Sequence, residues 1–172
     1  MPYPEKRGLL MSRTGKNVLI SLESRHAECV TSGKKKVELR TRRMNLSKGD
    51  RVWIYKKQPQ GGIVCAATVK AVDEGSPKAL WGQYRAVCGI TKEEFFAYFA
   101  AVKIGYAISL YKIERLPKPV SLKRMRTKDQ NFHPPQFSKY LIDKTPLLTF
   151  LEASLRARYT GDSQRQANSG TA

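Results

Sequence analysis

Acidic residues are scarce in this 172-residue sequence, which has 14 aspartates and glutamates against 32 lysines and arginines, for a net charge of +18. A field of that sign concentrates polyanions around a molecule, so nucleic acid is the first partner to consider. Long apolar runs are also absent. Without about 18 consecutive apolar residues, and without an obvious basic amphipathic helix, the chain is not expected to associate with a membrane.

Residues that could hold a metal are few. The sequence has two histidines and three cysteines, without the spacing of a zinc site. Cys29, Cys65 and Cys88 are far apart in apolar surroundings, which predicts reduced core thiols. The first residues lack the apolar stretch of a signal peptide, and no phosphate-binding glycine motif occurs. We therefore expect a cytoplasmic protein with no cofactor and no metal.

The length suits one domain with a real core. We predict a flexible arm at residues 1–15, a folded domain at 16–158 and a disordered tail at 159–172. The tail is small and polar, so burial would not offset the entropy lost on ordering it.

Hydrophobic periodicity and turn signals predict ten elements in the order β-α-β-β-β-α-α-β-β-α. The predicted strands are 17–22, 35–41, 51–56, 61–72, 105–116 and 118–126. The predicted helices are 24–33, 76–89, 91–100 and 146–159. Because short turns join consecutive strands, the order predicts an α+β fold, a small and mainly antiparallel β-barrel decorated by short helices.

One glutamate lies within the most basic segment, "SGKKKVELRTRR" from Ser32. On a strand, Glu38 and Arg40 share one face, opposite Val37 and Leu39. Glu38 could simply reduce the repulsion among the cations and orient Arg40 through charge-assisted hydrogen bonds. Alternatively, it could accept a hydrogen bond from a base edge or move a proton, while neighbouring cations hold phosphate. The pattern alone leaves both interpretations open.

A series of motifs resembles the ASCH domain of the PUA-like superfamily. It begins with the Gly-x-Lys-x-x-Glu-x-Arg pattern from Gly33 and continues with "KGDRVWIY", "SPKALW", "GITKEEFFAYFA", "GYAISL" and "HPPQFSKYL". The resemblance covers roughly residues 17–141. It implies a small β-barrel with a cleft that binds RNA or modified nucleotides, lined here by Lys35, Glu38 and Arg40.

Some relatives of this kind are hydrolases, so the resemblance leaves open whether the chain is an enzyme. If it is, Lys35 and Glu38 would be the catalytic residues. In members that hydrolyse acetylated cytidine, the matching Lys works with a Thr three residues on and a more distant Glu. This chain has Glu38 and Cys88 at about those places, which counts against an amidohydrolase.

Further candidates come from aromatic and basic residues. Tyr55, beside Lys56, could stack a base, whereas Trp53 on the same strand face is expected to pack under a helix. His133 and Gln136 lie in a Pro-stiffened loop, and the segment 115–128 holds six basic residues and no acidic residue. The residues predicted to contact nucleic acid are Lys34, Lys35, Lys36, Arg40, Arg42, Arg43, Tyr55, Lys56, Arg124, Arg126, His133 and Gln136.

The second histidine, His26, is expected to face solvent or to be partly packed. We predict a nucleic-acid-binding module whose partner is RNA, another single-stranded nucleic acid or a modified nucleoside. The alternatives are a ribonuclease or nucleoside amidohydrolase, and an adaptor that docks on a ribonucleoprotein. An exposed apolar patch would mark the adaptor, and residues 146–155 are the candidate segment.

Overall fold

The computed structural model describes the backbone of residues 15–59 and 61–167, and side chains as far as residue 157. Most of the predicted N-terminal arm therefore lies outside the described residues, as do residues 168–172 of the predicted tail. The last helix continues to Ala167, past the predicted start of the tail at 159. The predicted domain limits remain predictions.

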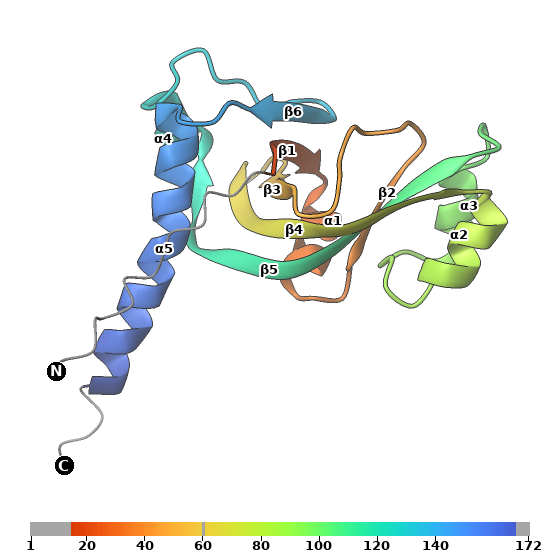
Figure 1. Cartoon of the computed structure of the whole chain (residues 1–172), viewed down its shortest axis with the longest axis horizontal. Coiled ribbons are helices and arrows are strands. Elements are labelled where there is room, and N and C mark those ends of the chain that lie inside the picture. The colour runs from red at the N-terminus through yellow and green to blue at the C-terminus, as the bar shows by residue number, and fades with distance from the viewer. Residues whose placement is uncertain (1–14, 60, 168–172) are drawn as a thin grey trace, which may run out of the picture.

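Six strands form one curled sheet (Figure 1), in the order β2-β5-β4-β3-β1-β6. The strands are β1 (Asn17–Leu22), β2 (Val37–Arg40), β3 (Arg51–Lys56), β4 (Gly62–Gly75), β5 (Gly105–Ser121) and β6 (Ser138–Leu141). All neighbouring pairs are antiparallel except β1 and β3, which are parallel. The mainly antiparallel, barrel-like α+β fold is therefore confirmed.

The sheet curls along its two longest strands. The register between β4 and β5 shifts at three places, between Ile63 and Cys65, Ala66 and Thr68, and Val69 and Ala71. Such bulges increase the local twist and bend the strands. The bending curls the sheet into a half-barrel. Its two edge strands are β2 and β6, and helices and loops can cover their residues.

In the described part of the chain, five helices surround the sheet: α1 (Ser24–Thr31), α2 (Pro77–Tyr84), α3 (Lys92–Tyr98), α4 (Leu122–Arg126) and α5 (Pro146–Ala167). Ser76 caps α2, and Thr91 with Glu94 forms a reciprocal capping box at α3, so both helices begin next to the predicted starts at 76 and 91. None of the helices within the described residues has both the length and the apolarity needed to span a bilayer.

Near the C-terminus, one predicted strand was wrong and one observed strand was not predicted. The segment 118–126 is not a separate strand, because β5 continues to Ser121 and α4 follows at once. The Ser121 hydroxyl accepts a hydrogen bond from the Arg124 backbone N–H, which is the N-cap that starts this helix. Strand β6 was not predicted, since its four residues carry only one buried side chain, Leu141.

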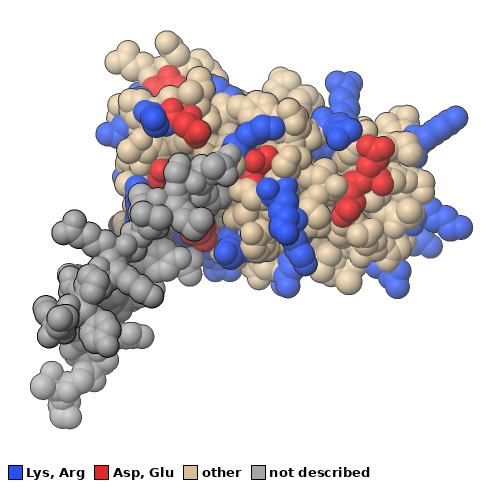
Figure 2. All heavy atoms as spheres, viewed as in Figure 1, with Lys and Arg blue, Asp and Glu red and all other residues tan. Residues whose placement is uncertain are grey.

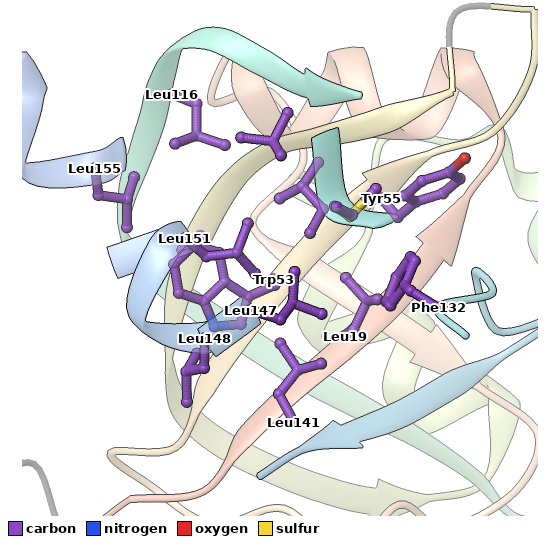
Figure 3. Close-up of a cluster of buried hydrophobic side chains, with 14 residues drawn as sticks. Leu19, Trp53, Tyr55, Leu116, Phe132, Leu141, Leu147, Leu148, Leu151 and Leu155 are labelled. Atoms are coloured by element: carbon purple, nitrogen blue, oxygen red, sulfur yellow. The ribbon is translucent and has the colours of Figure 1, made fainter. Parts of the chain in front are cut away.

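The C-terminal helix is anchored in a hydrophobic cluster around Trp53 (Figure 3). Leu147, Leu148 and Leu151 of α5 are buried there, and the Trp53 ring N–H donates to the Asn17 side chain at 3.0 Å. Trp53 is thus packed under a helix, as predicted. All four leucines of 146–155 are buried and Phe150 packs against the same cluster, so this segment does not provide the exposed patch that an adaptor would need.

Candidate functional site

A buried carboxylate at strand β2 lies between a buried lysine and a largely buried arginine. One oxygen of Glu38 is 3.5 Å from the Lys35 Nζ, and the other is 3.1 Å from Arg40 Nη2. The three side chains are only 8%, 4% and 12% exposed for Glu38, Lys35 and Arg40, respectively. We call these three residues the Glu38 site.

The alternation of β2 places Glu38 and Arg40 on one face. Val37 and Leu39 point the other way, into a hydrophobic cluster with residues of α2 and α3. On β5, Ile108 is the cross-strand partner of Glu38, and Tyr106 is the partner of Arg40. The sequence therefore predicted the correct split between the two faces, although not that the charged face would be buried.

The loop between α2 and α3 holds Lys35 in place. Lys35 Nζ donates to the carbonyl oxygen of Cys88 at 3.1 Å, and the Lys36 N–H donates to the Val87 carbonyl. Gly89, at φ +71°, lies so close that a Cβ there would be 3.1 Å from the Lys35 Cβ. The Cys88 thiol is buried, and it is the backbone carbonyl of this residue that faces the ammonium group.

The Glu38 site carries more positive than negative charge. One carboxylate faces two cations: Arg40 Nη2 is paired with Glu38, whereas Arg40 Nε is buried without a hydrogen-bond acceptor among the described residues. Desolvating a cation is costly unless its donors are satisfied. The arrangement can therefore accommodate an additional anionic or oxygen-rich group, such as a phosphodiester.

His26 lies close to this charge cluster. Its Nδ1 is buried and has no hydrogen-bond partner in the described part of the chain. Burial lowers the pKa of His26, and the charges of Lys35 and Arg25 lower it further, while Glu38 and Glu94 oppose the shift. The imidazole is consequently neutral at pH 7. The sequence did not reveal this position, because the helical pattern says nothing about which charges α1 approaches.

The predicted basic residues next to the site are on the surface. Lys34, Lys36, Arg42 and Arg43 are all exposed, before and after β2. Figure 2 shows basic side chains distributed around the face in view, with acidic groups between them rather than one continuous basic patch. The four residues flank the Glu38 site in sequence and can meet a polyanion there.

The β3 candidates are placed differently. Tyr55 is only 3% exposed, in the same cluster as Trp53, and burial raises its pKa. Its ring does not present a face to solvent for stacking. Lys56 pairs with Glu28 of α1 at 3.2 Å.

The remaining residues predicted to contact nucleic acid are on α4 and in the segment before β6, apart from α3. Arg124 and Arg126 are exposed on α4, which Figure 1 places beside α5, at the other end of the molecule from α3. The Arg124 guanidinium lies over the Phe150 ring at 5.0 Å, and Arg126 Nε donates to the Phe132 carbonyl at 3.2 Å. His133 and Gln136 are exposed in the segment before β6.

Within the described residues, no group of three or more histidine, cysteine, aspartate and glutamate side chains could hold a metal ion.

Comparisons with known proteins agree on the family. A family model described as "Domain of unknown function (DUF365)" matches residues 16–129. The chain is 29% identical over 126 residues to the ASCH domain-containing ribonuclease of Zymomonas mobilis subsp. mobilis, which covers 73% of this chain and 84% of that protein. The crystal structure of ASCH from Zymomonas mobilis has a TM-score of 0.74 and 26% identity, covering 80% of this chain and 94% of that one.

A second structure of the Zymomonas mobilis protein, with one serine replaced by alanine, has a TM-score of 0.74 at 27% identity and covers 80% of this chain and 95% of that one. The fold is that of an ASCH domain. The chain belongs to the DUF365 family and is an ASCH-domain protein, which confirms the resemblance in its motifs.

Proposed function

We propose that this protein binds single-stranded RNA and cleaves it at the Glu38 site. The observation that carries the proposal is the buried Glu38 carboxylate between Lys35 and Arg40, with Arg40 Nε left without an acceptor among the residues described. A phosphodiester supplies the missing oxygens and negative charge. The relative in Zymomonas mobilis is called a ribonuclease, which favours cleavage over binding alone.

RNA carries its own nucleophile, so the protein needs only proton transfer and charge stabilisation. Glu38 accepts the proton of the ribose 2′-hydroxyl, and the 2′-oxygen forms a bond to phosphorus. Arg40 and Lys35 stabilise the negative charge that develops on the phosphoryl oxygens. The bond from phosphorus to the 5′-oxygen breaks, and that oxygen takes a proton from Lys35. The products are a 2′,3′-cyclic phosphate and a 5′-hydroxyl.

The flanking basic residues hold the rest of the strand. Lys34, Lys36, Arg42 and Arg43 are exposed on both sides of β2, where they can contact successive phosphates. Such contacts increase affinity without selecting a sequence. Single-stranded DNA should bind to the same residues but stay intact, because it lacks the 2′-hydroxyl.

The test is the product formed from a labelled single-stranded RNA. Wild-type protein should generate fragments that end in a 2′,3′-cyclic phosphate, and the DNA of the same sequence should remain uncut. Lys35→Met keeps the apolar stem but removes the ammonium group, and should reduce the cleavage rate by about 10²- to 10³-fold. Lys57→Met removes a lysine from the exposed Lys57–Glu23 ion pair and should cleave normally. Uncut RNA with wild-type protein would overturn cleavage, and failure to retain RNA would overturn binding as well.

A further inference from the structure

An aromatic side chain is hydrogen-bonded to the backbone of β2, the strand that carries Glu38 and Arg40. Tyr98, the last residue of α3, is 46% exposed. Its hydroxyl donates to the carbonyl oxygen of Leu39 at 3.2 Å. Leu39 is the residue between Glu38 and Arg40, so Tyr98 is attached to the same short strand that carries the site.

The exposed ring is held rigidly. It makes an edge-to-face contact with Phe99, with ring centroids 4.9 Å apart and planes at 74°. Phe99 is fully buried, and its ring leaves no room for a side chain at Gly105, where β5 begins. The Thr91 and Glu94 capping box fixes the start of the helix. Because little conformational freedom remains, a ligand that packs on this ring loses little entropy on ordering it.

The surroundings suit a nucleotide. Arg40 is paired across the strands with Tyr106, and Arg42 and Arg43 are exposed just beyond the end of β2. A ring with cations nearby matches the combination of base stacking and phosphate contacts by which proteins hold single strands. A protein partner would also cover an exposed tyrosine, but the high positive charge of the chain and of this segment favours a polyanion.

We propose that Tyr98 stacks against a base of single-stranded RNA adjacent to the phosphate bound at the Glu38 site. The proposal rests on the proposed function, since it takes RNA to be the ligand. Tyr98 replaces Tyr55 as the stacking residue, because Tyr55 is buried. Stacking tolerates any base, so the ring sets the position of the strand rather than a sequence.

The test separates the contribution of the bases to affinity from the contribution of the sugar-phosphate backbone. Affinity is measured by fluorescence anisotropy for a short 2′-O-methyl RNA, which cannot be cleaved through its 2′-oxygen, and for an abasic oligomer of the same length. Tyr98→Ala should weaken binding of the 2′-O-methyl RNA by about 5- to 150-fold and leave the abasic oligomer nearly unaffected. The salt dependence of binding should not change, because no charge is removed. Tyr98→Phe keeps the ring and should bind almost as wild type, which separates stacking from loss of the hydroxyl contact with Leu39.

The control is Phe137→Ala, which removes an aromatic ring that is 71% exposed before β6, and should not alter either affinity. The stacking role would be overturned if Tyr98→Ala bound the 2′-O-methyl RNA as tightly as wild type does. It would also be overturned if the variant lost the same affinity for the 2′-O-methyl RNA and for the abasic oligomer. Either result leaves RNA binding and cleavage by the wild type intact, so the proposed function would stand. If wild-type protein neither retains nor cleaves RNA, both proposals fail.

Discussion

The ammonium group of Lys35 lies 3.1 Å from the carbonyl oxygen of Cys88, although 53 positions separate the two residues in the chain. The loop between α2 and α3 is therefore as much a part of the Glu38 site as β2 itself. It holds Lys35 under the surface, where the charge of this lysine acts in a medium of lower polarity than water.

Gly89→Ala tests this contact. The φ of +71° costs a residue with a Cβ about 1–2 kcal/mol, and the new methyl group would press on the Lys35 side chain. We expect thermal unfolding of Gly89→Ala to show this loss of stability. We also expect its rate of RNA cleavage to fall by more than the small fraction of unfolded protein can explain. Gly82→Ala is the control, because Gly82 lies within α2 with open space around it and alanine should stabilise the helix by up to about 1 kcal/mol. Normal cleavage by Gly89→Ala would show that the position of Lys35 is not critical.

Leu151→Ala tests the attachment of α5. Leu151 is fully buried against the Trp53 cluster, so the substitution should destabilise the domain by about 2–5 kcal/mol. Thr149→Ala changes an exposed residue of the same helix and should stay within about 0.5 kcal/mol of wild type. Chemical denaturation gives both values. Equal stability of the two variants would mean that α5 is not part of the cooperative core.

His26 should make stability depend on pH. Its pKa is lowered from its ordinary value of 6.5, so below pH 6.5 the unfolded chain takes up a proton that the folded protein resists. The free energy of unfolding should therefore decrease as the pH falls from 6.5 toward the lowered pKa, and this component should level off below it. The charged groups that influence this histidine are Lys35, Arg25, Glu38, Glu94 and Glu23.

The measurement is the free energy of unfolding at a series of pH values from 8 down to about 5. His26→Asn should remove this component of the pH dependence, whereas His133→Asn changes an exposed histidine and should keep it. A pH dependence in His26→Asn that matches wild type would contradict the effect of burial on this histidine.

Arg42 and Arg43 should contribute to the salt dependence of RNA binding. Each contact with a single-strand phosphate adds about −0.7 to the slope of log affinity against log salt concentration. Arg42→Gln and Arg43→Gln should each make the slope shallower by about that amount for every sequence alike. Arg124→Gln measures the same slope for an arginine on α4, at the other end of the molecule from α3, where Arg124 lies over the Phe150 ring. If all three variants keep the wild-type slope, neither end contacts phosphate.

The sequence predicted local features well where their cause was local. The alternation of Val37, Glu38, Leu39 and Arg40 correctly assigned the two faces of β2, because strand periodicity is a property of the backbone. The helices predicted to start at 76 and 91 likewise correspond to α2 and α3, whose starts are fixed locally by the caps Ser76 and Thr91.

Features that depend on distant segments were not predictable. The burial of Tyr55 depends on which elements cover β3, and the exposure of Tyr98 depends on how α3 packs against the sheet, and neither can be inferred from local periodicity. The parallel pairing of β1 with β3 depends on how the chain returns after α1 and β2. The contact of Lys35 with the Cys88 carbonyl required the loop after α2 to fold back over β2.

The most direct test of the central claim is the single-turnover rate of RNA cleavage by Glu38→Gln. The amide keeps the shape of the side chain, but cannot accept the 2′-hydroxyl proton as a base. The rate should fall by about 10²- to 10⁴-fold while the protein stays folded, and Glu23→Gln, from the exposed pair with Lys57, should cleave at the wild-type rate. An unchanged cleavage rate, together with slightly tighter binding of every polyanion, would contradict the account and make Glu38 a residue that only balances charge on a basic strand.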